Sequence, residues 1–169
     1  MIGGDDGAMT TWNDFALAEP DLAGRARTRF EAHGLGLMAT IRADGSPRLS
    51  GIEPLFADGE LWLGMMPDGR KSADLRRDPR LALHNATTDK AVTEGDVKVS
   101  GRAVLVDDPD AIRAYIASFA EEAGAPPPPG PFDLWRIDLT EVAMITPGGD
   151  HLVIESWRPD RGLRRIERR

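Results

Sequence analysis

The sequence contains no cysteine among its 169 residues. This absence excludes disulfide bonds, thiolate metal sites and a cysteine nucleophile. It fits a reducing compartment, where disulfides do not persist, and the expected location is the cytoplasm. The chain does not open with a charged segment followed by a short apolar one, so no signal peptide is expected.

Long apolar runs and excess positive charge are missing too. The longest apolar run is far shorter than the roughly 18 residues of a membrane-spanning helix, so we expect no membrane partner. The net charge is -7 and the pI is about 5.0. Nucleic-acid binding needs a basic surface, so no nucleic-acid partner is expected. The length is that of one domain.

The sequence also lacks the residue spacings that are typical of metal sites or acid–base catalysis. His33, His84 and His151 do not have metal-ligand spacing, and we find no positioned pair of carboxylates. We therefore predict no metal site and leave the catalytic residues unassigned. An enzyme whose cofactor carries the chemistry need not show such residues.

Residues 35–83 are the most informative part of the chain. Apolar and polar residues alternate there as in strands, and Asp-Gly pairs at 44–45 and 58–59 indicate tight turns. Strands joined by tight turns form an antiparallel sheet, which excludes a parallel nucleotide-binding fold. Gly51 and Pro54 interrupt the second of these strands and indicate a bulge or a close backbone approach.

The whole chain predicts a small antiparallel barrel with helices on its outside. Strands are expected over 35–42, 48–56, 60–65, 80–86, 97–106, 132–146 (with a bend near Leu139) and 151–157. Helices are expected over 22–33, 70–77 and about 108–123, the last with an apolar stripe of Ile112, Tyr115, Ile116 and Phe119. Five prolines within 125–131 predict a stiff connection. We expect a flexible leader over 1–17, a domain over 18–158 and a solvated basic tail over 159–169.

Arg70, Lys71 and Ser72 open the predicted helix 70–77. The start of a helix offers unpaired N–H groups, and two cations and a hydroxyl add to its attraction for phosphate. A solvated helix start has the same residues, and on the residues alone both interpretations stay open.

The chain resembles a known family over about residues 18–158. Ala-Thr-Ile-Arg-Ala-Asp-Gly-Ser-Pro, followed by Gly-Arg-Lys-Ser-Ala-Asp-Leu-Arg-Arg-Asp-Pro-Arg, resembles the pyridoxamine 5'-phosphate oxidase-like flavin-binding split barrels. It is most similar to their branch of flavin- and deazaflavin-dependent reductases. The resemblance implies a mainly β fold, a six- to seven-stranded antiparallel split barrel with flanking helices. It also implies a homodimer with its cofactor sites at the subunit interface.

The resemblance further implies a set of cofactor-binding residues. Arg70 and Lys71, with Ser72 beside them, would hold a phosphate, and the cofactor ring would lie along the strand at 47–52 and at the end of the strand at 60–65. The implied set is Arg48, Leu49, Ser50, Met65, Met66, Arg70, Lys71 and Ser72. FMN is the expected cofactor, the deazaflavin coenzyme F-420 is the alternative, and haem ranks after both.

Two departures from the true oxidases argue against pyridoxamine phosphate as the substrate. Residues 65–68 read Met-Met-Pro-Asp where the oxidases have a Thr-Asn-Tyr-type segment. Residues 157–161 read Trp-Arg-Pro-Asp-Arg and lack the histidine of the oxidases' C-terminal substrate clamp.

The primary hypothesis is therefore an oxidoreductase that transfers hydride to or from another small-molecule substrate. The alternative is a flavin- or tetrapyrrole-binding carrier or sensor without turnover. A third hypothesis is a structural homologue that has lost its cofactor.

Overall fold

Alternating apolar residues and short turns give a chain made mostly of strands. The computed structural model describes residues 9–169, which form nine strands and four helices. The strands are β1 (Gly36–Ile41), β2 (Pro47–Ile52), β3 (Pro54–Ala57), β4 (Glu60–Met65), β5 (Arg80–Asn85), β6 (Asp96–Val106), β7 (Asp133–Pro147), β8 (Leu152–Arg158) and β9 (Gly162–Arg168). The helices are α1 (Trp12–Ala18), α2 (Pro20–Glu31), α3 (Arg70–Arg77) and α4 (Pro109–Ala123).

The strands form one antiparallel sheet whose two ends are consecutive in the chain. The order is β2-β1-β5-β6-β7-β4-β3, and β8 and β9 extend from β7. The expected strand 48–56 is therefore wrong as a single strand. It divides at Glu53 into β2, which pairs with β1, and β3, which pairs with β4. One residue thus joins the two ends of the sheet, and the sheet curls into a barrel.

Strand β7 is where the barrel splits. Its first residues pair with β4, whereas its last residues pair on the same edge with β8. Between these partners the N-terminal segment pairs with β7: Leu139 N donates to Thr10 O at 2.9 Å, and Thr10 N donates to Asp138 Oδ1 at 2.8 Å. The opposite edge of β7 pairs with β6 along most of its length.

The bend expected near Leu139 is confirmed as a bulge. The register of β6 and β7 shifts between Ser100 and Gly101, so that Ser100 lies opposite Glu141 and Gly101 opposite Leu139. A β-carbon on Gly101 would lie 2.5 Å from the carbonyl oxygen of Asp138. Only glycine fits there without a shift of the backbone, and the bulge increases the local twist that helps the barrel to close.

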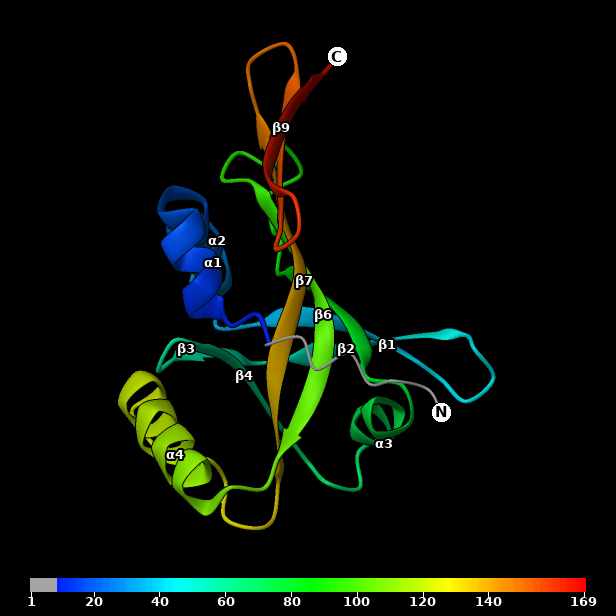
Figure 1. The fold of residues 1–169 in the computed structure, drawn as a ribbon, viewed down its shortest axis with the longest axis vertical. Helices are drawn as coiled ribbons and strands as arrows, with labels where there is room; N and C mark the ends of the chain where they lie inside the picture. Colours follow the sequence, from blue (N-terminus) through cyan, green and yellow to red (C-terminus); the bar gives the residue numbers. More distant parts are fainter. Residues whose placement is uncertain (1–8) are drawn as a thin grey trace.

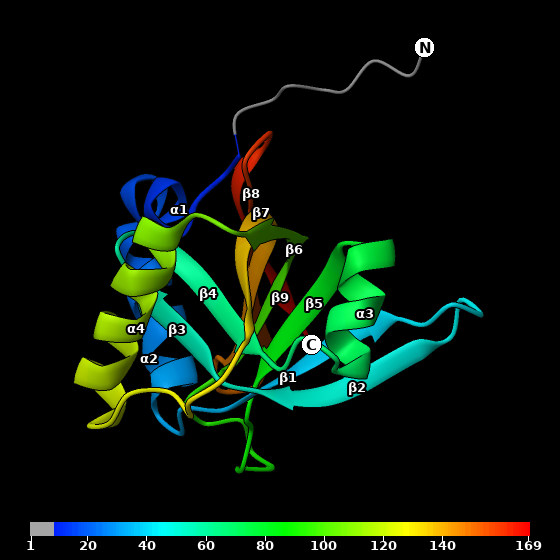
Figure 2. The ribbon, with the colours of Figure 1, turned by 90° about the horizontal axis from the view of Figure 1, so that it is seen from below.

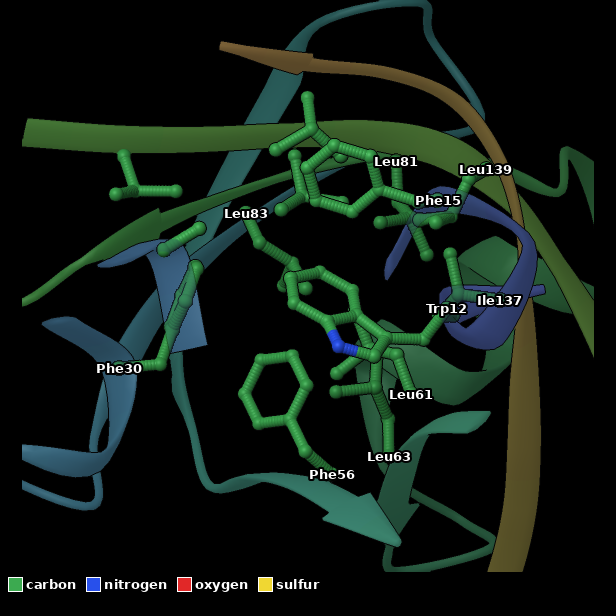
Figure 3. Close-up of a cluster of buried hydrophobic side chains, with 14 of the residues drawn as sticks. Trp12, Phe15, Phe30, Phe56, Leu61, Leu63, Leu81, Leu83, Ile137 and Leu139 are labelled. Atoms are coloured by element: carbon green, nitrogen blue, oxygen red, sulfur yellow. The ribbon is translucent and has the colours of Figure 1, made fainter. Parts of the chain in front are cut away.

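The main core fills the barrel and continues beneath α1 and α2. Trp12 and Phe15 from α1 and Phe30 from α2 lie against Phe56 and the inner faces of β4, β5 and β7 (Figure 3). The ring of Phe15 is fully buried, with centroids 5.2 Å from Trp12 and 4.8 Å from Trp157. Helix α1 therefore links the barrel to β8.

A second cluster lies under α4. Leu55, Trp62, Tyr115 and Leu134 are buried there, and Phe119 and Phe132 pack against them. The expected apolar stripe of this helix and the strand-free proline segment at 125–131 are confirmed. Helices α4 and α3 lie on opposite sides of the barrel (Figure 2). Among residues 9–169, none of the helices has the length and apolar character needed to cross a bilayer.

The expected flexible leader is wrong for the part that the structure describes. Thr11 caps α1 by accepting from Asp14 N at 3.1 Å, and the Asp14 carboxylate accepts from Thr11 N at 2.8 Å. This capping box and the burial of two aromatic rings make α1 part of the domain. Residues 1–8 of the leader lie outside the described residues.

The expected solvated tail is also wrong, because most of it forms β9. Leu163 pairs with Trp157 and Ile166 with Ile154, so the arginines alternate with apolar residues along a hairpin. Gly162, at a φ of 68°, completes the turn after β8. The hairpin projects from the far end of the molecule, away from α3 and α4 (Figure 1). This strand and the division at Glu53 raise the expected seven strands to nine, while the mainly β, antiparallel class is confirmed.

The contribution of α1 to the core can be measured directly. We expect Phe15→Ala to lower the free energy of unfolding in urea by about 3–5 kcal/mol, since it removes a fully buried ring. Leu17→Ala is the matched control on the same helix, because Leu17 is 75% exposed, and it should change stability by no more than about 0.5 kcal/mol. Equal effects of the two substitutions would show that α1 is not part of the core.

Candidate cofactor site

Side chains from α3 tie this helix to β2. Arg48 Nε donates to Asp74 Oδ2 at 2.6 Å, and Thr40 Oγ1 donates to the same oxygen at 2.9 Å. The other oxygen of Asp74 accepts from Arg77 at 3.5 Å. Asp74 is 3% exposed and Arg48 only 17% exposed in its side chain, so the carboxylate fixes the guanidinium at the inner side of β2.

These hydrogen bonds keep Asp74 ionised. Burial by itself would raise the pKa of this carboxyl, but the hydrogen bonds from Arg48 and Thr40 and the charge of Arg48 outweigh burial and leave the pKa below its ordinary value. A buried carboxylate held in this way orients its cation, because both partners lose their water together.

Lys71 makes the second connection between α3 and β2. Its Nζ donates to the backbone oxygen of Gly51 at 2.8 Å, which places the ammonium one residue from Ser50. Burial lowers the pKa of Lys71, while the negative charge of Glu53 acts in the opposite direction. One of the three ammonium donors is used in this contact and two are left. Arg70, at the start of the helix, is exposed.

Ser72 points away from this cluster. It is fully buried, and its hydroxyl donates to the carboxylate of Asp133 at the start of β7. Arg76 also donates to Asp133, at 2.6 Å, and lies 5.8 Å from the centre of the Trp135 ring. This second buried carboxylate fixes the other face of α3 to β7. In this structure the Ser72 side chain joins α3 to β7. Its contact with a phosphate stays a prediction.

The remaining members of the implied set divide between two faces. Arg48 and Ser50 lie on the inner side of β2, whereas Leu49 points outward and is 68% exposed. Met65 is buried at the end of β4, and Met66, the next residue, is 76% exposed. The structure therefore brings Arg48, Ser50 and Lys71 together and leaves Leu49 on the outer surface.

A groove of about 710 Å³ begins beside this cluster. It is bounded by the loop after β4, by α4 and by the proline segment. The lining residues are Glu53, Gly64, Met65, Met66, Pro67, Asp68, Gly69, Tyr115, Phe119, Pro127, Pro128, Pro129, Gly130, Pro131 and Phe132. Both charged members of this set are acidic. Burial raises the pKa of Tyr115 to about 12, and the negative charge of Glu53 adds to this effect.

The comparisons with known proteins agree with this architecture. The model of the pyridoxamine 5'-phosphate oxidase family matches residues 22–146, which is most of the chain. The chain belongs to the pyridoxamine 5'-phosphate oxidase family. The match includes β1 to β6, α3 and nearly all of β7, and therefore every residue of the implied cofactor-binding set. Within residues 9–169, no group of three or more His, Asp or Glu side chains is arranged to hold a metal ion.

The chain is similar to several solved structures, and those proteins bind different ligands. It is 26% identical to a conserved hypothetical protein from Mycobacterium tuberculosis, over 68% of this chain and 78% of that one, with a TM-score of 0.58. It is 17% identical to a pyridoxamine 5'-phosphate oxidase-related, FMN-binding protein from Nostoc punctiforme, over 96% and 98% of the chains, with a TM-score of 0.62. It is 18% identical to a heme-binding protein from Mycobacterium smegmatis, over 80% and 58%, with a TM-score of 0.60. The last two likenesses show the fold alone.

Sequence reasoning missed Asp74 and Tyr115. Asp74 stands on a short helix among four arginine and lysine side chains, where an acid looks like part of a solvated face. Tyr115 belongs to the apolar stripe of its helix, and a stripe of this kind does not indicate a neighbouring groove. One signal could have indicated Asp74. Thr40 and Arg48 lie opposite one another on neighbouring strands, and an arginine that faces inward requires an acidic partner.

The carboxylate of Asp74 should determine both stability and its pH dependence. We expect Asp74→Asn to lower the free energy of unfolding at neutral pH by about 1.5–3 kcal/mol, because charge-assisted hydrogen bonds are lost. The folded pKa is lower than the unfolded one, so the stabilisation is present above the unfolded pKa of about 3.9 and is lost as pH falls through the folded value. The difference between wild type and variant should therefore shrink below about pH 4.

Urea unfolding at several pH values measures this difference. Asp160→Asn is the control, because Asp160 is 68% exposed and pairs only with the neighbouring Arg161. It should have almost no effect at any of these pH values. A gap between wild type and Asp74→Asn that stays constant down to pH 2 would contradict the assignment.

Proposed function

We propose that this member of the family is a flavin-dependent oxidoreductase that binds FMN against β2 and the start of α3 and acts as a homodimer. The single observation that carries the proposal is that two cations are held where α3 meets β2: Arg48 by the buried carboxylate of Asp74, and Lys71 by the backbone oxygen of Gly51. An FMN-binding protein of the same fold supports the choice of ligand class.

The residues of this cluster fit a phosphate group. No side chain caps the start of α3, where Gly69 is the N-cap residue, so the first N–H groups of the helix are left for an anion. Arg70 is exposed and Lys71 has two unused donors. Lys71 is also partly desolvated, which lowers its pKa. A dianion beside it would recover part of that cost, because opposite charge favours the ammonium form.

Each part of the site would have a defined task. A bound flavin supplies the hydride chemistry. Lys71, Arg70 and the start of α3 would hold the phosphate, and Arg48 and Ser50 on the inner side of β2 would contact the ring. Asp74 would keep Arg48 in place. The apolar wall formed by Met65 and Met66 would exclude water from one side of the ring.

Flavin is preferred over haem because of the residues at the proposed cofactor site. Neither β2 nor α3 contains a histidine, so these elements offer haem no imidazole ligand. The deazaflavin coenzyme shares the phosphate and the tricyclic ring, and it remains the alternative cofactor. Equilibrium titration of the purified chain with FMN and with the deazaflavin coenzyme, followed by absorbance and fluorescence, distinguishes the two.

Turnover separates the proposed enzyme from a carrier. Once a flavin is bound, its reduction by a nicotinamide donor or its reoxidation by an organic acceptor is followed by absorbance. Reduction and reoxidation at rates far above those of free flavin support an oxidoreductase. Tight binding without either reaction would support the carrier or sensor, and failure of every flavin to bind would support a homologue without cofactor.

Lys71→Ala tests the phosphate seat. We expect FMN binding to weaken by about 10- to 100-fold, since one charge-assisted contact is lost, while thermal unfolding changes little. Lys90→Ala, in the exposed loop between β5 and β6, is the matched control and should bind FMN like the wild type. Unchanged affinity in Lys71→Ala would remove this residue from the site.

A second copy of the chain would cover the outer face of β1 and β2. Leu35, Leu37 and Leu49 are 49%, 42% and 68% exposed on this side, and Ala39 lies directly opposite Leu49 in the strand pairing. Grouped apolar side chains on a surface mark an interaction site. The same strand carries Arg48 and Ser50 on its inner side, so pairing through Leu49 would place the interface next to the cofactor.

Leu49→Asp tests this arrangement. We expect sedimentation to show a shift from dimer to monomer, because a charge would be buried in an apolar interface. Leu17→Asp is the control, since Leu17 is 75% exposed on α1 and far from β2. A wild-type monomer, or a Leu49→Asp variant that remains dimeric, would contradict the proposed interface.

A further inference from the structure

Tyr115 is a buried residue, only 4% exposed, and it lines the groove. The ring packs with Trp62, Phe119 and Phe132, at centroid distances of 5.7–6.4 Å. A phenylalanine would pack equally well there. Packing therefore does not require the hydroxyl, and because Tyr115 lines the groove this group can serve a molecule bound there.

Gly64 provides the space for this hydroxyl. A β-carbon at Gly64 would overlap the Tyr115 oxygen, so any larger residue in β4 would displace the ring. Gly64 and Tyr115 both line the groove. Strand glycine weakens a sheet and often marks a place that another group approaches closely. The pair therefore places a hydroxyl among the aromatic and proline residues that line the groove.

The groove and its surroundings are acidic. Glu53 and Asp68 line it, and a smaller hollow of about 330 Å³, which shares Glu53 and Phe119 with it, adds Glu31 and Glu122. Burial raises the pKa of Glu122, and the charge of Glu31 adds to this effect. Neither hollow is lined by a lysine or arginine among the described residues. A phosphate or carboxylate ligand would be repelled by these lining carboxylates.

We infer that the groove binds the substrate of the proposed oxidoreductase, an uncharged planar compound whose carbonyl oxygen accepts a hydrogen bond from Tyr115. That the ligand is a substrate rests on the proposed function. Its binding in the groove does not require a bound flavin. Phe119, Phe132 and the prolines supply apolar walls, which suit a ring system. Glu53 lies between the groove and Lys71, so the ligand would bind beside the cofactor seat.

The phenol is suited to this task. Its raised pKa keeps it protonated over the physiological range, so that it acts as a donor at every relevant pH. The preference would also exclude phosphorylated amines such as pyridoxamine phosphate, whose anionic group has no cation to bind in the groove.

Binding of two matched probes tests the inference. Menadione is planar, uncharged and carries carbonyl oxygens, and naphthoquinone sulfonate adds one negative charge to the same ring system. The chain has no cysteine, so thiol adducts do not complicate calorimetric titration. We expect the wild type, without flavin, to bind menadione and to bind the sulfonate several-fold more weakly. Glu53→Gln should reduce the difference in affinity between menadione and the sulfonate, because it removes one negative charge from the groove.

Tyr115→Phe removes only the hydroxyl and should weaken menadione binding about 3- to 10-fold. Gly64→Ala should weaken it at least as much, while Gly24→Ala, whose β-carbon would meet no atom within 4 Å, should not. FMN affinity and thermal unfolding are measured for each variant. Equal binding of menadione to wild type and Tyr115→Phe, or equal affinity for the sulfonate, would overturn the inference.

The two proposals fail in different ways. FMN binding without menadione binding would leave the proposed cofactor seat intact and remove the groove ligand. Menadione binding that depends on Tyr115, in a chain that binds no flavin, would keep the groove as a ligand site and remove the oxidoreductase. Loss of both in a variant with wild-type thermal unfolding would show that Tyr115 supports the cofactor seat instead.

Discussion

The one-residue connection at Glu53 is the constraint on which the site depends. Because β2 and β3 stand at opposite ends of the strand order and yet follow one another in the chain, the sheet must curl until its ends meet. The meeting point joins the end of β2 at Ile52 to the start of β3 at Pro54, which pairs with Leu63 of β4. It also leaves Glu53 between Lys71 and Tyr115, whose pKa values both respond to its charge.

Helix α3 turns this closure into a rigid arrangement through two buried carboxylates. Asp74 binds Arg48 and Thr40 on one side of the helix, and Asp133 of β7 binds Ser72 and Arg76 on the other. Each carboxylate is satisfied by several donors, which is the condition for a buried charge to be tolerated. An eight-residue helix is too short to be stable alone, so these contacts and the burial of Leu75 hold its first turn in place.

The sequence was sufficient where local signals act alone. The helix expected over 70–77 has the bounds of α3, and the Asp-Gly turns predicted the antiparallel class. It was insufficient where partners are distant. The break at Glu53 looks like a bulge until β2 and β3 are seen to pair with different strands. The arginines of β9 look solvated until Leu163 and Ile166 meet β8, and the resemblance alone could not show that Ser72 faces Asp133 and not the cation cluster.

The charges divide the region on either side of Glu53 into two unlike halves. Cations and uncapped N–H groups gather at α3, whereas the charged residues that line the groove under α4 are both acidic. At an effective dielectric constant near 20, two unit charges 4 Å apart interact by about 4 kcal/mol. An energy of this size is enough for an anion to prefer the cationic site over the acidic groove. Salt screens such effects beyond roughly 8–10 Å. An anionic cofactor and an uncharged ring can therefore bind to neighbouring sites. The acidic groove repels the anion, and the cations at α3 give no charge attraction to an uncharged ring.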